Sequence, residues 1–111
     1  MSGSSGGELL IAYLQHMPET VTQLSNDEIA DRLRSLRGWE IKDGKLTKAF
    51  TFDGFMGAVR FVDRIAPLAE SEGHHPDLQV SWGRVVVELT THSAGGLTAK
   101  DFKLASLIEK L

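Results

Sequence analysis

The sequence of 111 residues contains no cysteine, no long hydrophobic run and no excess of positive charge. Without cysteine, the protein has no disulfides, no thiolate nucleophile and no sulfur ligand for a metal, and it suits a reducing compartment. The longest apolar run, Leu9 to Leu14, is far shorter than the roughly 20 residues that span a bilayer, and no basic segment precedes it as in a secretory signal. We therefore expect a soluble cytoplasmic protein that does not bind membranes.

The charge balance also argues against nucleic acid as a partner. The 12 lysines and arginines are outnumbered by 15 aspartates and glutamates, whereas nucleic-acid-binding proteins usually carry a basic stripe. With 41% hydrophobic and 24% charged residues, the composition is that of an ordinary globular protein. We expect a Gly/Ser leader resembling an expression tag at residues 1–7, an extension of unknown role at 8–23, and a single domain at 24–111.

Two capping boxes predict the first and third helices. Ser25 with Glu28 starts a helix expected from Asn26 to Leu36. Thr98 with Asp101 starts another, in which we expect the aspartate to have a structural role at the helix end. Apolar residues then repeat along one face of this third helix at Leu104, Ala105, Ile108 and Leu111.

A second helix is expected after Asp53, which could cap it. Its apolar stripe is expected to consist of Phe55, Val59, Val62, Ala66 and Ala69. Pro67 lies inside this segment, where it removes a hydrogen bond at a cost of roughly 3 kcal/mol. A kink or break is therefore expected there, with Glu70 just beyond it.

Turn signals predict two hairpins. Asp43-Gly44 is a strong two-residue turn and should place Ile41 opposite Leu46. Gly83-Arg84 is the expected turn of the second hairpin.

The second turn would make Trp82 face Val85 and would bring His75 opposite His92. We also expect Trp82 to lie in the core or in an interface.

Together these elements predict an α+β fold, a two-layer sandwich in the order α-β-β-α-β-β-α. A four-stranded antiparallel sheet would carry three helices on one face, and its other face would be open to solvent or a partner. That open face suggests an oligomer.

Three of the four histidines fall in the carboxyl-terminal half, at His74, His75 and His92. Histidine is the side chain that most readily both gives and accepts a proton near neutral pH. This concentration therefore suggests proton transfer on a small molecule. A metal site is the rival interpretation, but neighbours on an extended strand point to opposite faces, so His74 and His75 would be poor joint ligands. An adjacent His-His pair can also be simply a polar entry into a strand.

The spacing of these residues resembles the signature of the pterin-4a-carbinolamine dehydratase family. That signature is an acid, three residues, His-His-Pro, a spaced aromatic, a spaced histidine and an aspartate. The matching positions are Glu70, His74, His75, Pro76, Trp82, His92 and Asp101, and the resemblance extends over roughly Leu24 to Leu111.

The resemblance implies dehydration of 4a-hydroxytetrahydrobiopterin to quinonoid dihydropterin, which recycles the cofactor of aromatic amino-acid hydroxylases. Such a hydro-lyase uses no metal or other cofactor. The resemblance implies that His74, His75 and His92 are catalytic, with His74 and His92 as the proton-transfer pair. Glu70, His75 and Thr91 would bind the substrate.

The resemblance also implies partners. A homodimer or homotetramer is expected, and the family includes members that bind a transcription factor or resemble assembly chaperones. A protein partner such as a hydroxylase or a transcription factor is therefore possible by resemblance only, and a binding module without catalysis is the alternative function.

Overall fold

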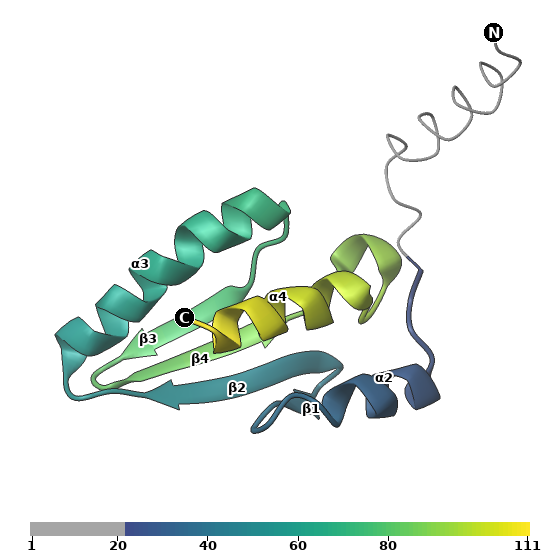
Figure 1. Ribbon diagram of the computed structural model, residues 1–111, viewed down its shortest axis with the longest axis horizontal. Helices are drawn as coiled ribbons and strands as arrows, with labels where there is room; N and C mark the ends of the chain where they lie inside the picture. Colours follow the sequence, from purple (N-terminus) through teal and green to yellow (C-terminus); the bar gives the residue numbers. More distant parts are fainter. Residues whose placement is uncertain (1–21) are drawn as a thin grey trace, which may run out of the picture.

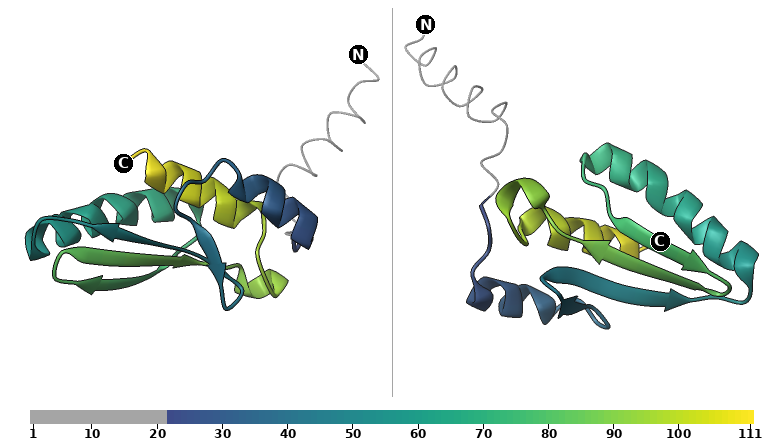
Figure 2. Two further views of the ribbon diagram at one scale, coloured as in Figure 1. Left: turned by 90° about the horizontal axis from the view of Figure 1, so that it is seen from below. Right: turned by 180° about the vertical axis from the view of Figure 1, so that it is seen from behind.

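The computed structural model describes residues 22–111, which fold into two layers (Figures 1 and 2). The first layer is an antiparallel sheet of β1 (Glu40–Lys42), β2 (Lys45–Thr51), β3 (Asp77–Ser81) and β4 (Arg84–Leu89). Within the described residues the second layer holds α2 (Asn26–Leu33), α3 (Phe55–Glu72) and α4 (Ala99–Glu109), and the 3-10 helix η1 (His92–Ala94) links β4 to α4. Figure 2 shows the α-helices on one side of the sheet. The expected α+β sandwich is confirmed.

The first hairpin has the predicted turn and register. Asp43 and Gly44 both adopt positive φ, at 51° and 75°, as a two-residue turn of this type requires. Ile41 pairs with Leu46. The strands are ordered β1-β2-β4-β3 in the sheet, so β1 and β3 form its two edges.

The second hairpin forms between β3 and β4, but the prediction of its turn was wrong. Ser81 pairs with Arg84, so the turn is Trp82-Gly83. Gly83 has a φ of 69° and therefore occupies the second central position of the turn. Gly83 also lies against Phe52 outside the hairpin, where it accepts a hydrogen bond from the Phe52 N–H at 2.8 Å and where a Cβ would lie 2.9 Å from the Phe52 carbonyl oxygen.

The changed turn shifts the register of this hairpin by two residues. Val85 faces Val80 rather than Trp82. His75 and His92 are not paired either, because β3 begins at Asp77 and β4 ends at Leu89. Trp82 is 76% exposed, so of its two expected places the core is ruled out, and the expected place in an interface stays a prediction.

Both capping boxes form as predicted. The Ser25 backbone N–H donates to Glu28, and the backbone N–H of Glu28 donates to the Ser25 hydroxyl. Thr98 and Asp101 make the equivalent box at the start of α4. Helix α2 ends earlier than Leu36, however, because the next residues make tighter bonds to the carbonyl three residues back, such as Leu36 N–H to Leu33 O.

Helix α3 differs from its prediction in its N-cap residue and in its continuity at Pro67. Its N-cap is Gly54, not Asp53. It also continues through Pro67 without a break, and Glu70 lies in its last turn. The carbonyl of Asp63 loses its intrahelical partner at Pro67, but both residues lie on the exposed side, where water can satisfy that carbonyl.

The buried face of α3 is also rotated from the predicted stripe. Phe55 is 51% exposed and Ala66 is also exposed. The buried residues of α3 are Ala58, Phe61, Ile65 and Ala69.

The core lies between α3, α4 and the facing side of the sheet. Its fully buried large side chains include Leu46, Ile65, Val85, Val87, Leu89, Leu104 and Ile108. Among residues 22–111, no helix is long and apolar enough to cross a membrane. The predictions for the leader at residues 1–7 and for most of the 8–23 extension lie outside the described residues.

Candidate active site

His74 follows α3 directly and lies in the connection to β3. Helix α3 ends at Glu72, its C-cap Gly73 adopts a φ of 61°, and the His74 backbone N–H donates to the carbonyl of Ala69. This bend turns the His74 side chain toward α4, where its Nε2 lies 2.5 Å from Asp101 Oδ1. The His74 side chain is 12% exposed and that of Asp101 is completely buried.

The hydrogen bonds around Asp101 form a connected network in which the donor and the acceptor of each bond can be assigned. Asp101 Oδ2 accepts from the Thr98 backbone N–H at 2.9 Å and from the Thr91 hydroxyl at 2.8 Å. The Thr91 proton is then used, so the Thr98 hydroxyl, 2.9 Å away, donates to Thr91. Because a carboxylate only accepts, His74 Nε2 carries the proton that it shares with Asp101. The second ring nitrogen of a neutral His74, Nδ1, is then an acceptor.

His75 points to a different element. Its Nε2 lies 2.5 Å from Glu70 Oε2 in the last turn of α3. The two side chains are 60% and 76% exposed, so water screens this contact and it contributes little to stability. Both groups are therefore accessible to a small molecule.

His92 is the first residue of η1 and is exposed. Among the described residues, no hydrogen bond or ion pair of its ring occurs. Thr91, the residue before it, is 5% exposed, and its hydroxyl is engaged with Asp101 and Thr98.

The Asp101 carboxylate connects the segments that carry the predicted site residues. It contacts His74 on one side and Thr91, the neighbour of His92, on the other. His75 follows His74 in the chain. Figure 1 shows the connection from α3 to β3 and the η1 loop at the same end of the sheet.

Sequence reasoning missed the contact between His74 and Asp101. The capping box predicted that one carboxylate oxygen of Asp101 would serve the start of α4, which is what Oδ2 does. It left the other oxygen unassigned, and the histidine that meets it lies 27 residues away in the chain. An aspartate with one uncommitted oxygen was the signal available in the sequence.

No group of three histidine, cysteine, aspartate or glutamate side chains in residues 22–111 is arranged to hold a metal ion. His74 and His75 contact carboxylates on two different helices, α4 and α3.

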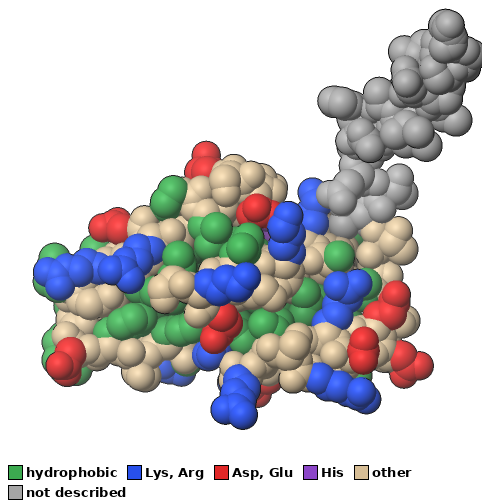
Figure 3. Space-filling view, in the orientation of Figure 1, with side chains coloured by type: hydrophobic (Ala, Val, Ile, Leu, Met, Phe, Trp, Pro, Cys, Tyr) green, Lys and Arg blue, Asp and Glu red, His purple; other side chains and the backbone are tan. Residues whose placement is uncertain are grey.

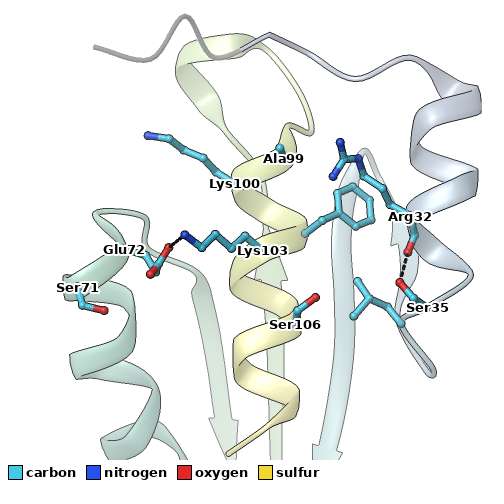
Figure 4. Close-up of a pocket in the computed structure, with 10 residues that line it drawn as sticks. Arg32, Ser35, Ser71, Glu72, Ala99, Lys100, Lys103 and Ser106 are labelled. Atoms are coloured by element: carbon cyan, nitrogen blue, oxygen red, sulfur yellow. Dashed lines mark hydrogen bonds and ion pairs between the residues drawn. The ribbon is translucent and has the colours of Figure 1, made fainter. Parts of the chain in front are cut away.

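A separate cavity of about 580 Å³ lies on the helix layer. Figure 4 shows it beside α4, with Lys103 reaching toward Glu72 at 3.3 Å, so part of its positive charge is neutralised within the cavity. No histidine lines it, and no histidine is visible on the same side of the molecule in Figure 3. The lining residues are Arg32, Ser35, Leu36, Ser71, Glu72, Ala99, Lys100, Phe102, Lys103 and Ser106. This cavity is distinct from the histidine site.

Comparison with known proteins identifies the family of the chain. A family model described as pterin 4 alpha carbinolamine dehydratase matches residues 22–111. The chain belongs to this family. The match covers every residue that the structure describes, including all the predicted site residues of this dehydratase-family protein.

Individual relatives agree with this assignment. A protein of Roseiflexus sp. (strain RS-1) is 47% identical over 90 residues, which cover 81% of this chain and 97% of the relative. A protein of Sulfolobus acidocaldarius is 48% identical over 89 residues, which cover 80% of this chain and 98% of the relative. Both carry the name pterin-4-alpha-carbinolamine dehydratase as a provisional assignment.

Two solved structures share the fold. The crystal structure of a transcriptional coactivator/pterin dehydratase from Brucella melitensis has a TM-score of 0.76 and 36% identity, covering 80% of this chain and 97% of that chain. A pterin dehydratase-like protein identified as a RuBisCO assembly factor in the alpha-carboxysome has a TM-score of 0.53 and 23% identity, covering 65% and 83%. The second likeness concerns the fold alone.

Proposed function

We propose that this dehydratase-family protein removes water from 4a-hydroxytetrahydrobiopterin, a pterin carbinolamine, to give the quinonoid dihydropterin. The reaction is a hydro-lyase reaction without metal or cofactor, and it recycles the pterin used by aromatic amino-acid hydroxylases. Membership of the family and the provisional names of the relatives support this activity.

The observation that carries the proposal is the contact between His74 and the buried Asp101. The carboxylate fixes which nitrogen of His74 holds the shared proton and leaves Nδ1 as the acceptor of the neutral ring. A histidine held in one tautomer beside a negative charge is suited to general acid–base catalysis.

The chemistry requires one acid and one base. Protonation of the 4a-hydroxyl allows the C–O bond to break and water to leave, while the neighbouring nitrogen supplies the electron pair for the new C=N bond. The proton on that nitrogen is then lost to the base. We assign this pair of transfers to His74 and His92, which lie in segments joined through Asp101 and Thr91.

The remaining predicted residues would hold the substrate. His75 and Glu70 are both exposed and lie in contact, so they offer a donor and an acceptor for the polar edge of a pterin. Thr91 was also expected to bind the substrate, but its buried hydroxyl donates to Asp101 and accepts from Thr98, so we assign it instead to holding Asp101 in place.

An ultraviolet assay of carbinolamine decay tests this function with a His74→Ala variant. Loss of the general acid–base group should lower the catalysed rate by about 10²–10⁴-fold. Gln79→Ala is a matched surface control, because Gln79 lies exposed on β3. Equal rates for wild type and His74→Ala would leave only a non-catalytic role.

We also propose that the protein is a cytoplasmic homodimer or homotetramer with a single domain at residues 24–111. Strands β1 and β3 are the edges of the sheet, and association would pair or shield their free backbone groups. The helices also leave one face of the sheet uncovered, and association could cover that face. Light scattering at micromolar concentration should report a mass at least twice that of the chain. A purely monomeric protein would refute this part of the proposal.

A protein-binding role is the second candidate. The Brucella melitensis relative is described as both a coactivator and a pterin dehydratase. Among residues 22–111, three large apolar side chains are more than half exposed, namely Phe55, Met56 and Trp82. Such side chains are frequent in protein interfaces. Capture of a hydroxylase or a transcription factor that survives His74→Ala but not Trp82→Ala would support this role.

A further inference from the structure

The position of His92 depends on its loop, because its ring has no hydrogen-bonding partner among the described residues. His74 and His75 each have a carboxylate partner, but His92 is exposed and is fixed only by the backbone around it. Whatever holds the η1 loop in place therefore also sets the position from which the His92 side chain extends.

The loop is closed by short-range backbone bonds. Thr91 and Gly96 form an isolated antiparallel bridge, in which the Thr91 N–H donates to Gly96 O at 3.2 Å. Gly95 adopts a φ of 76°, and its N–H donates to the carbonyl of His92 at 3.0 Å. These bonds define the shape of the loop, and the Thr91 hydroxyl anchors the side of the loop that precedes His92 to Asp101.

Two residues that precede α2 pack onto this loop. The Leu24 backbone N–H donates to the carbonyl of Leu97 at 2.8 Å. The side chain of Gln23 lies on Gly96, in the space that a side chain at this glycine would otherwise occupy. A Cβ built on Gly96 would be 2.6 Å from Gln23 Nε2, 3.0 Å from its Cδ and 3.2 Å from its Cγ. Gly96 has no positive φ, so its lack of a side chain serves this contact rather than an unusual backbone conformation.

We propose that Gln23 is a positioning residue for His92, and that Gly96 is the surface on which Gln23 rests. The inference rests on the proposed dehydratase function for its catalytic readout. The contact is one of packing, since no hydrogen bond from the Gln23 amide to the glycine backbone occurs. Gln23 therefore acts by its shape and acts through the loop, without touching the substrate.

The two positions can be tested as a pair. Gln23→Ala removes the side chain that lies on Gly96. Gly96→Ala instead adds a methyl group that displaces the same side chain, whose far end is flexible. Both changes should therefore disturb one contact, and the double variant should be little worse than either single variant. Gln23→Met restores a side chain of similar length without the amide and should restore the wild-type behaviour.

The kinetic readout is the dehydratase rate of these variants against wild type and Gln79→Ala. Displacement of a catalytic group by about 1 Å can cost up to about 100-fold, so kcat should fall by a factor between about 3 and 100. KM should change less, because His75 and Glu70 are unaffected. Losses that multiply in the double variant would overturn the proposal, because the two residues would then act separately.

A spectroscopic readout separates this proposal from the proposed function. In protein labelled with ¹³C-histidine, Gln23→Ala should shift or broaden the His92 ring signal, which is assigned with His92→Ala, while the His75 signal stays unchanged. Circular dichroism confirms that each variant is folded. An inactive wild type would refute the dehydratase function, and the His92 signal would still decide the role of Gln23. An unchanged His92 signal, with an unchanged kcat in an active enzyme, would overturn the positioning role.

Discussion

Replacement of Asp101 by asparagine should abolish most of the activity with little change to the fold. The wild-type carboxylate accepts three hydrogen bonds: from His74 at 2.5 Å, from Thr91 at 2.8 Å and from the Thr98 backbone at 2.9 Å. The single oxygen of asparagine can still serve Thr91 and Thr98. Its amide group then faces His74 and donates to Nε2, so His74 must move its proton to Nδ1.

The move of the His74 proton to Nδ1 determines how far kcat should fall. His74 would present a donor where the reaction needs an acceptor, and the nearby negative charge would be lost. General acid–base catalysis contributes about 10²–10⁴-fold, so kcat should fall by about that factor, which corresponds to a barrier higher by about 2.7–5.4 kcal/mol. The lost charge-assisted hydrogen bond should lower the free energy of unfolding by only about 1–3 kcal/mol. The ultraviolet assay and urea denaturation measure the two quantities.

The chain supplies a matched control in its other capping box. Glu28→Gln makes the same change from carboxylate to amide at the same position of helix α2, where no histidine contacts the side chain. Its activity should equal that of wild type. If Asp101→Asn does not fold, Thr91→Val removes one donor to the carboxylate while keeping the shape of the side chain, and it should lower kcat in the same direction. A folded Asp101→Asn protein with at least half of the wild-type kcat would refute the reasoning.

Three further predictions concern pH and stability. Hydrogen bonds from Ser25 hold the pKa of Glu28 below the ordinary value of 4.5, the backbone N–H having the larger effect and the hydroxyl the smaller one. The ionised Glu28 side chain therefore stabilises the fold above that pH, and this stabilisation is lost as the pH falls. When the pH is lowered from 6 to 3, the free energy of unfolding measured with urea should therefore fall less for Glu28→Gln than for wild type. Identical pH dependences would contradict this. Pro67→Ala should raise the free energy of unfolding by up to about 3 kcal/mol, because it restores a hydrogen-bond donor inside α3, and a lower urea midpoint would argue against it. Finally, kcat should decrease as the pH is lowered through the range in which histidine takes up a proton, whereas a flat profile between about pH 5 and 8 would count against histidine catalysis.

Local signals predicted those parts of the fold that depend on few neighbouring residues. The Ser25 and Thr98 capping boxes and the Asp43-Gly44 turn each involve residues at most three apart, and all three form as predicted. Gly83 shows why other turns are harder to predict, because it can occupy either central position of a two-residue turn. In the structure Gly83 takes the second position, where it lies against the backbone of Phe52, the residue after β2, and this contact cannot be read from the hairpin itself.

Helix α3 and the site show a similar limit. The periodicity of α3 allows two overlapping stripes, and packing buries the one that contains the large side chains Phe61 and Ile65. The predicted pairing of His75 with His92 was wrong in register, yet the segments that hold the histidines are joined through Asp101. That contact spans 27 residues, and only the three-dimensional packing of α4 against the end of α3 reveals it.

The central claim is that His74, oriented by Asp101, transfers a proton during dehydration of the carbinolamine. Chemical rescue tests it most directly, by measuring carbinolamine decay with His74→Ala in the absence and presence of free imidazole. The account predicts that the variant loses about 10²–10⁴-fold in rate and that imidazole restores part of that loss, because the missing group is an imidazole. A His74→Ala protein that is as fast as wild type without imidazole would contradict it.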